Sequence, residues 1–190
     1  MKSPVIGDGE LTLRLLRLRD RDIWTQVRRI NSEWLTPWEA TRPDLPDGIH
    51  QGPLPTYVQM VAHQRREAKQ GRSFALGMWL TDGNKERFIG QITLGGVVYG
   101  AYRGGYIGYW VDQRYANRGY TTRAVQLLTE FAFTKLALHR IEINIRPENE
   151  ASRKVAEKAG YLLEGARPRY LHIDGDWRDH LTFVRENPAK

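Results

Sequence analysis

The chain contains no cysteine among its 190 residues. This absence excludes a disulfide framework and any metal site built on thiolates. The histidines in the second half of the chain, His139, His172 and His180, share no spacing that indicates a metal site either. The sequence therefore predicts a protein that uses no metal.

The chain also lacks an apolar segment long enough to cross a membrane, and residues 1–10 lack the apolar run of a secretory signal. The apolar fraction of 41% is enough for a hydrophobic core, and a length of 190 residues fits one domain. We therefore expect one cytoplasmic domain over residues 1–190, with no membrane partner.

Acidic side chains are fewer than basic ones: the chain has 22 of the former and 29 of the latter, so its formal net charge is +7. A basic surface favours polyanionic partners such as nucleic acid, a ribosome or a phosphate-rich cofactor. The same excess is also common on surfaces that only face water. Charge alone therefore does not select a partner.

Apolar periodicity and turn residues predict a mixed α/β fold: a largely antiparallel central sheet of about seven strands, with helices on both faces. The expected order is a strand, two helices, three strands, a helix, a strand, a helix and two strands. The strands are expected at residues 10–15, 73–80, 87–94, 106–111, 140–146 and 161–164, and in a hairpin that turns at Asp174-Gly175.

The first helix and the segment after it carry two further expectations. Asp20 or Asp22 can cap this helix, and its predicted buried stripe is Ile23, Val27 and Ile30. Residues 35–55 are rich in proline and predict a long ordered loop, which in a compact domain usually carries function.

Residues 105–124 read as a strand, a short polar loop and the opening of a helix. The loop is made of small and hydroxyl-bearing residues around Gly119. Because a helix N-terminus leaves backbone N–H groups unpaired, this turn predicts an anion site. A plain surface turn is the alternative for a lone glycine.

Residues 140–146 alternate strictly, so Ile141, Ile143 and Ile145 are expected in the core. This strand and the strand at 106–111 are joined by a helix and are expected to be parallel neighbours. Asn149 is a suitable cap for a helix over residues 150–159, which Gly160 ends.

Four stretches together resemble the GNAT acetyltransferase family, and the resemblance covers nearly the whole chain. They are WLTPWE at 34–39, IGYWV at 107–111, PENEAS at 147–152 and YLHIDGDWRDH at 170–180, of which the last is the longest and most specific. Within the family, the chain resembles enzymes that acetylate the N-terminal alanine of a small-subunit ribosomal protein. The resemblance implies acetyl-CoA as donor, direct transfer in a ternary complex, a splayed pair of parallel strands, and possible ribosome or rRNA association.

The family holds the CoA pyrophosphate in a loop that reads Gln or Arg, two residues, Gly, one residue, then Gly or Ala. The matching span is 116–121, where only Gly119 fits, and Ala116 and Thr121 depart from the pattern. Backbone N–H groups make such phosphate contacts, so these departures need not abolish binding. The residues assigned to acetyl-CoA by resemblance are Trp110, Val111, Asn117, Arg118, Gly119, Tyr120, Thr121, Thr122, Asn149 and Ser152.

Three residues carry the expected chemistry. The resemblance makes the N–H of Val111 a candidate oxyanion donor and Ser152 the group that protonates the departing thiolate. Asn149 and Ser152 lie one helical turn apart, so both can face the cleft. The simpler alternative is that Asn149 only caps the helix and Ser152 is its capping partner.

No general base is evident. Relatives place a glutamate at the positions of Asn144 or Tyr106, and a tyrosine at that of Ala156. An α-amine with a pKa of about 7.7–8.0 is roughly one-sixth neutral at pH 7, whereas only about one lysine in 2,500 is. The missing carboxylate therefore favours a protein N-terminus over a lysine side chain.

The acceptor is expected on the side of the proline-rich loop and the final hairpin. The candidate acceptor-binding residues are Trp38, Glu39, Tyr106, Asn144 and Tyr170. Glu39 can hold or deprotonate a cationic amine, or can simply be a solvated loop acid.

Two other functions stay open. The acceptor can be a small amine, such as a polyamine or an antibiotic. The chain can also be a non-catalytic module that binds acyl-CoA or ribosomal RNA, in keeping with the altered pyrophosphate loop, the absent base and the positive charge.

Overall fold

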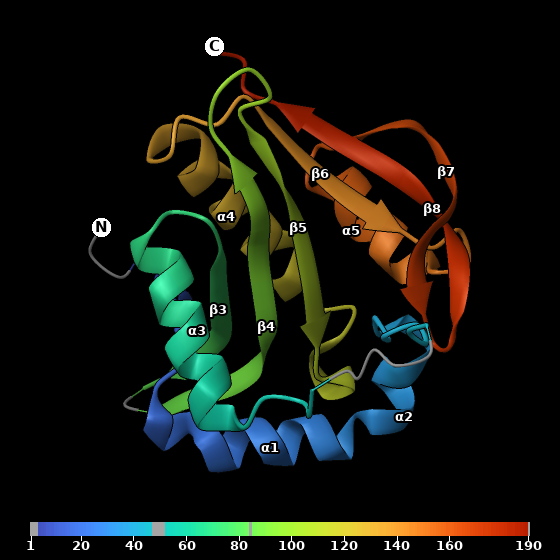
Figure 1. Cartoon of the computed structure of the whole chain (residues 1–190). Coiled ribbons are helices and arrows are strands. Elements are labelled where there is room, and N and C mark those ends of the chain that lie inside the picture. The colour runs from blue at the N-terminus through green and yellow to red at the C-terminus, as the bar shows by residue number, and fades with distance from the viewer. Residues whose placement is uncertain (1–3, 47–51, 84, 190) are drawn as a thin grey trace.

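The computed structural model describes residues 4–46, 52–83 and 85–189. Within this part of the chain, eight strands form one open sheet in the order β1-β2-β3-β4-β5-β6-β8-β7 (Figure 1). All neighbours are antiparallel except β5 and β6, so the predicted mixed fold is confirmed. The sheet has one strand more than the seven expected, because the short β1 pairs with β2 at the edge.

The strands are β1 Val5–Gly7, β2 Leu11–Leu15, β3 Phe74–Asp82, β4 Lys85–Val98, β5 Gly104–Val111, β6 Arg140–Ile145, β7 Leu162–Ile173 and β8 Asp176–Glu186. The helices are η1 Leu18–Asp20, α1 Arg21–Ile30, α2 Ser32–Leu35, η2 Thr36–Trp38, α3 Tyr57–Lys69, η3 Gln113–Tyr115, α4 Tyr120–Thr134 and α5 Glu150–Lys158.

Helices cover both faces of the sheet, as predicted. In Figure 1, α3 lies in front of the sheet and α4 and α5 lie behind it. Ile141, Ile143 and Ile145 of β6 are buried in the main core, which confirms the alternation read from the sequence. No helix within the described residues is both long and apolar enough to span a membrane.

The predicted buried stripe of α1 is partly wrong. Val27 is buried, but Ile23 and Ile30 are 37% and 53% exposed. Trp24 takes the inner face instead, packs into the second core cluster, and donates from Nε1 to Gln91 Oε1 at 3.1 Å. Residues three or four apart share a helix face, so the inner stripe runs through Trp24, Val27 and the buried Asn31 at the end of the helix.

The proline-rich segment is predicted to be a long loop. Its described residues confirm a loop except at the start of the segment, which is helical. It opens with α2 and η2, and then runs beside the final hairpin, where Ala40 pairs with Ile173 and the Thr41 N–H donates to the His172 carbonyl at 2.9 Å. Residues 47–51 of this loop lie outside the described residues. The loop thus leads from η2 towards α3 along the chain and packs beside the end of β7.

The two parallel strands diverge. Their pairing runs from Gly104 opposite Arg140 to Tyr106 opposite Glu142, whereas β5 continues to Val111 and β6 to Ile145. Beyond Tyr106, β5 stays paired with β4, and β6 stays paired with β8. The predicted splay is therefore present, and it opens the sheet between the two strands.

Asp20 links the start of α1 to the sheet. It occupies the N-cap position, but its carboxylate accepts from Arg14 Nη1 at 2.8 Å and from the Arg17 N–H at 2.8 Å. Arg14 and Asp20 are 4% and 5% exposed, so this is a buried ion pair. Buried charges are costly unless they are paired.

Replacing Asp20 with alanine is expected to lower the free energy of unfolding by about 3 kcal/mol, because it removes a carboxylate from the buried Arg14 guanidinium. Urea unfolding followed by circular dichroism measures this loss. Asp22→Ala is the matched control, since Asp22 is exposed in the same turn, and its expected loss is below about 1 kcal/mol. Equal losses in the two variants would contradict the structural role of Asp20.

Candidate active site

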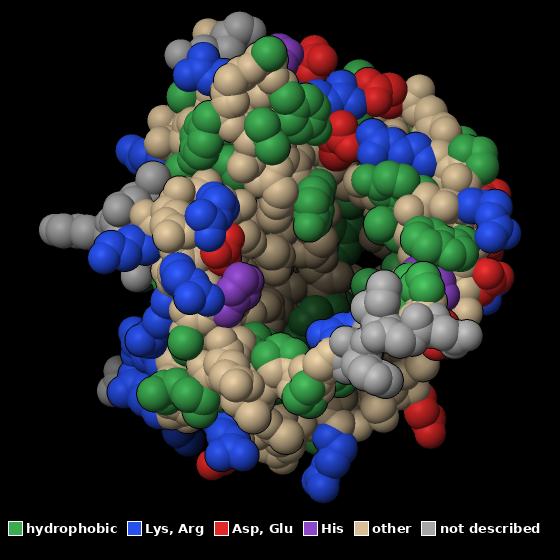
Figure 2. Space-filling model, viewed as in Figure 1, with side chains coloured by type: hydrophobic (Ala, Val, Ile, Leu, Met, Phe, Trp, Pro, Cys, Tyr) green, Lys and Arg blue, Asp and Glu red, His purple; other side chains and the backbone are tan. Residues whose placement is uncertain are grey.

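A cleft follows the divergence of β5 and β6. It has a volume of about 580 Å³ and is lined by β5, the start of α4, α5 and the segment from Trp34 to Ala40. Figure 2 shows the molecule hollowed over the place where the two strands separate in Figure 1. A second cleft of about 230 Å³ shares Trp38, Ala40, Gly108, Tyr109 and Ser152 with the first.

The N-terminus of α4 opens onto the larger cleft. Gly119 is its N-cap residue with a left-handed φ of 82°, and no side chain of the described residues caps the helix there. A Cβ built on Gly119 would meet no atom within 4 Å, so the space in front of this helix end is free. Unpaired N–H groups facing open space make a suitable place for a phosphate.

The predicted loop residues divide into two groups around this helix end. Asn117, Gly119, Thr121 and Thr122 line the larger cleft. Arg118 and Tyr120 are not among its lining residues. The Arg118 guanidinium lies 5.6 Å from the ring centre of Tyr115, and the Tyr120 hydroxyl donates to Glu10 Oε1 at 3.2 Å.

The backbone of Val111 faces the gap between the strands. The Asp112 N–H donates to the Ile89 carbonyl at 2.8 Å, and Val111 lies opposite Gly90. In an antiparallel ladder this pattern turns the N–H and C=O of Val111 away from β4. The Val111 carbonyl accepts from Trp34 Nε1 at 3.3 Å, which leaves the N–H for a ligand.

Trp110 is placed differently from Val111. It lies opposite Gln91, in the position whose backbone groups pair with β4. Its indole lines the larger cleft and lies edge-on to Phe88, with the Arg28 guanidinium 5.2 Å from its centre. The backbone of Trp110 is therefore paired with β4 and is not free to bind a ligand.

Asn149 caps α5, as predicted. Its Oδ1 accepts from the Ser152 N–H at 3.0 Å. Asn149 does not line either of the two clefts, whereas Ser152 lines both. The capping role of Asn149 is therefore visible in the structure, and a catalytic role stays a prediction.

Tyr109 is a site residue that the sequence reasoning missed. Its hydroxyl lies 2.8 Å from Ser152 Oγ and 3.2 Å from the Ser152 carbonyl. Burial raises the pKa of the Tyr109 phenol, against the effect of its bond with Ser152, so the phenol keeps its proton at neutral pH. The alternation of β5, which places Ile107 and Tyr109 on the face of the core, was the available signal.

The predicted acceptor-binding residues are only partly brought together. Trp38 and Asn144 line the smaller cleft, and Thr182 Oγ1 donates to Asn144 Oδ1 at 2.8 Å. Tyr106 and Tyr170 line neither cleft. The Tyr106 ring covers Gly95 and Gly96, where a Cβ would lie within 3.0 Å of it, and Tyr170 lies edge-on to His180, with ring centres 5.8 Å apart.

Glu39 lines the larger cleft but is not an isolated carboxylate. Its Oε1 forms an ion pair with Arg28 Nη2, and both side chains are partly exposed. The structure thus places Glu39 at the cleft with its charge already matched.

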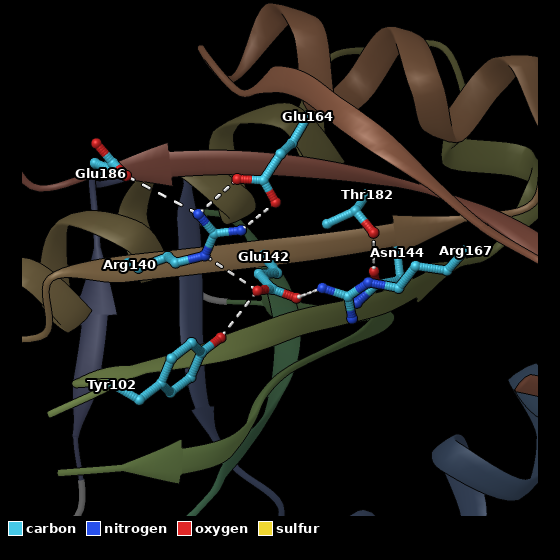
Figure 3. Close-up of polar contacts among 8 residues, drawn as sticks. All are labelled: Tyr102, Arg140, Glu142, Asn144, Glu164, Arg167, Thr182 and Glu186. Atoms are coloured by element: carbon cyan, nitrogen blue, oxygen red, sulfur yellow. Dashed lines mark hydrogen bonds and ion pairs between the residues drawn. The ribbon is translucent and has the colours of Figure 1, made fainter. Parts of the chain in front are cut away.

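Glu142 is the carboxylate nearest to Asn144 along β6, and it is bound by three side chains. Figure 3 shows Tyr102, Arg140 and Arg167 converging on it, at 3.0, 3.1 and 2.8 Å. Burial opposes its charge, but the bonds from Arg140 and Tyr102 and the charge of Arg167 leave its pKa lowered. Glu142 is therefore a structural anion rather than a general base.

The comparisons with known proteins agree with this geometry. Residues 10–162 match the model of the acetyltransferase (GNAT) domain. The chain belongs to the GNAT acetyltransferase family. As a member of this family, it is an acetyltransferase with the sheet, the strand divergence and the α4 N-terminus described above.

Three relatives of this GNAT acetyltransferase are informative. The Escherichia coli [ribosomal protein uS5]-alanine N-acetyltransferase is 29% identical over 180 residues, which cover 94% of this chain and 88% of that one. The Bacillus subtilis protein named "Probable N-acetyltransferase YjcK" is 39% identical over 103 residues, and the match spans 54% of this chain and only 57% of YjcK. The structure of Mycobacterium smegmatis RimJ in complex with CoA-disulfide has a TM-score of 0.85 and 33% identity, with 97% of this chain and 88% of that chain covered.

Asn149→Ala is expected to lower the free energy of unfolding by about 1 kcal/mol, since it removes the side chain that caps α5. The acetylation rate is expected to fall with it, because Ser152 lies in the turn that the cap holds. Asn149→Asp keeps an acceptor oxygen at the cap and is expected to restore both quantities. Urea unfolding and steady-state acetylation measure them.

Restored stability without restored rate in Asn149→Asp would instead show that the amide acts in catalysis. Unchanged stability in Asn149→Ala would contradict the capping role.

Proposed function

We propose that this enzyme transfers the acetyl group of acetyl-CoA to the α-amine of a protein N-terminus, with a ribosomal protein as the acceptor and an N-terminal alanine as the acceptor residue. The observation that carries the proposal is the layout of the larger cleft. It joins the uncapped N-terminus of α4 to the Val111 N–H and to the Tyr109–Ser152 pair along one line of the sheet opening.

The cleft fits the parts of acetyl-CoA in order. The free N–H groups before and within the first turn of α4 suit the pyrophosphate, with Gly119 leaving open space in front of them. The strand edge at Tyr109 and Val111 suits the amides of the pantetheine arm, which can pair with it as a strand does. Lys154 and Lys158, which line the same cleft on α5, add positive charge for phosphate.

Thr121 takes the position where the family pattern has glycine or alanine. Its side chain is 9% exposed and lines the larger cleft. A buried hydroxyl at the first turn of α4 can donate to a phosphate oxygen. The threonine that replaces the family's glycine or alanine can therefore add a hydrogen bond to the pyrophosphate.

The reaction is a direct transfer. The neutral amine attacks the thioester carbonyl carbon, and the developing oxyanion is stabilised by the Val111 N–H, a contribution typically of about 10²–10³ in rate. The C–S bond then breaks and the sulfur takes the electron pair. Ser152 Oγ gives its proton to the thiolate and recovers one from the Tyr109 hydroxyl, 2.8 Å away.

The charges around the cleft support an acceptor that is not strongly cationic. Among the described lining residues, Arg28, Lys154 and Lys158 line the larger cleft with one carboxylate, that of Glu39, and Arg146 lines the smaller cleft. Such a lining gives no acidic attraction for a polyamine. A protein N-terminus, whose amine is roughly one-sixth neutral at pH 7, is better matched to it.

A basic surface supports an acceptor that is presented on a ribosomal particle. Arg65, Arg66 and Lys69 are exposed on α3, and Arg17 and Arg19 are exposed beside them around η1. Figure 2 shows Lys and Arg side chains gathered over this part of the molecule, away from the hollow. Clustered cations of this kind bind the phosphate backbone of RNA in a salt-dependent way.

Coenzyme A at about 100 times its dissociation constant is expected to stabilise the protein by about 2.7 kcal/mol, which raises Tm by about 5–10 °C. Gly119→Trp is expected to abolish this shift and the acetyl transfer, because the indole fills the space before α4. Gly9→Trp is the matched control, since Gly9 also has a positive φ and open surroundings. Differential scanning fluorimetry measures the shift, and an undiminished shift in Gly119→Trp would refute the placement of the pyrophosphate.

Acceptor choice is tested with a panel of amines followed by mass spectrometry. A lysine-free peptide with a free N-terminal alanine is expected to react about 100-fold faster than the same peptide with a blocked N-terminus and one lysine. Comparable rates on the two peptides would defeat the N-terminal proposal. Faster turnover of spermidine or an aminoglycoside would establish the small-amine alternative.

The same assay separates the remaining alternatives. Coenzyme A binding without transfer to any amine, small ribosomal particles included, would leave the non-catalytic module. If the target is presented on a particle, the rate on particles falls steeply with salt, while the rate on the free peptide changes little.

A further inference from the structure

His180 lines the smaller cleft and has no part in the steps above. It is on β8, is 3% exposed, and lines the smaller cleft together with Ser152, Gly108 and Asn144. Histidine is the side chain whose ordinary pKa suits proton transfer near neutral pH. A buried histidine beside the reacting groups of a transferase is therefore a candidate for the missing base.

The ring of His180 is oriented by the backbone. Nδ1 lies 2.9 Å from the Arg178 carbonyl, which can only accept, so Nδ1 carries a proton. In the neutral ring, Nε2 then holds the free lone pair. No second hydrogen bond of this ring is found among the described residues, and the edge-on Tyr170 ring fixes its plane.

The other groups in the smaller cleft do not compete for this role. Of its described lining residues, only Tyr109, Arg146 and His180 titrate. Tyr109 keeps its proton, and the Arg146 guanidinium is always charged. Glu39 and Glu142 are held by arginines, so His180 is the neutral nitrogen that remains.

We propose that His180 Nε2 accepts, directly or through one water molecule, the proton that the acceptor amine loses as it is acetylated. This inference rests on the proposed function, since it assigns a base to that same reaction. It places the acceptor amine in the smaller cleft, on the face of the sheet that carries Asn144 and Trp38.

The step balances without a further reactant. The amine nitrogen forms the bond to the carbonyl carbon and becomes an ammonium, which passes one proton to Nε2 as the C–S bond breaks. The sulfur is protonated by Ser152, which is reprotonated by Tyr109. The imidazolium then returns its proton through the solvent in the opened cleft to the Tyr109 oxygen, and the enzyme regains its starting state.

The surroundings keep His180 neutral at the pH of the reaction. Burial lowers its pKa most strongly, and Arg146 at the end of β6 lowers it further, while the Arg178 carbonyl, Asp179 and Glu148 act in the opposite direction. The net effect is a lowered pKa. The base form therefore dominates at pH 7, and it is lost only as the pH falls below about 6.5.

His180→Asn is the decisive variant, because the asparagine amide can still donate to the Arg178 carbonyl from the place of Nδ1 while Nε2 is removed. We expect kcat on the N-terminal alanine peptide to fall by about 10²–10³-fold, the usual contribution of a general base. The acid limb of the wild-type kcat profile, below about pH 6.5, is expected to disappear. The thermal shift caused by coenzyme A is expected to stay unchanged.

His172→Asn is the matched control, since His172 lies on the same hairpin, is half-buried, and contacts Thr41 at 2.7 Å outside the clefts. It is expected to keep the wild-type rate and pH profile. His180→Ala, assayed with added imidazole, is a second test that does not depend on asparagine packing correctly. Imidazole is expected to restore activity in proportion to its neutral form.

A wild-type rate and an intact acid limb in His180→Asn would overturn the inference while leaving the proposed function standing. A loss of activity in His180→Asn together with no imidazole rescue of a folded His180→Ala would also overturn it, in favour of a purely structural role. Failure of the wild-type enzyme to acetylate the peptide would instead refute the proposed function.

Discussion

The end of pairing between β5 and β6 is the constraint on which the site depends. Up to Tyr106 the two strands share a ladder, and beyond it each is held only on its far side, β5 by β4 and β6 by β8. Backbone groups left without a partner inside a protein are costly, so the gap has to be filled by water or by a ligand. A thioester arm with amides of its own is a chemically matched filling.

The opened sheet brings together side chains from opposite faces. Tyr109 points with the core residues of β5 toward α5, where it meets Ser152. Asn144, Thr182 and His180 belong to the other face, beside Trp38 and Arg146. Acetyl transfer needs an acid at the sulfur and a base at the nitrogen. In this structure the proposed acid, Ser152, and the proposed base, His180, lie on opposite sides of one opening, where they do not neutralise each other.

Much of the fold could be predicted because its signals are local. The alternation of Ile141, Ile143 and Ile145, the cap at Asn149 and the Asp174-Gly175 turn each depend on neighbours in the chain, and each is found in the structure. The predicted buried stripe of α1 was partly wrong because Trp24 and Ile23 both fit the helical period of the buried residues. Only the position of Gln91, 67 residues further on, decides between them.

The site was less predictable because its chemistry depends on long-range pairs. Nothing in the sequence near Glu39 shows that Arg28 will neutralise it, and nothing near Ser152 shows that Tyr109 will lie beside it. The motif at 170–180 contains His180, but the meaning of that histidine comes from the Arg178 carbonyl, which fixes its tautomer. These facts require three-dimensional contacts.

The charged side chains around the cleft bear on the choice of acceptor. Glu39 at the larger cleft and Glu142 on β6 are each paired with an arginine, and the proton acceptor that we propose is a neutral imidazole. Such a site does not attract a cationic amine strongly, and it acts on the fraction that arrives neutral. At pH 7 that fraction is about 400 times larger for an α-amine than for a lysine. The proposed selectivity for protein N-termini then follows from the acidity of the amine itself, without a carboxylate to enforce it.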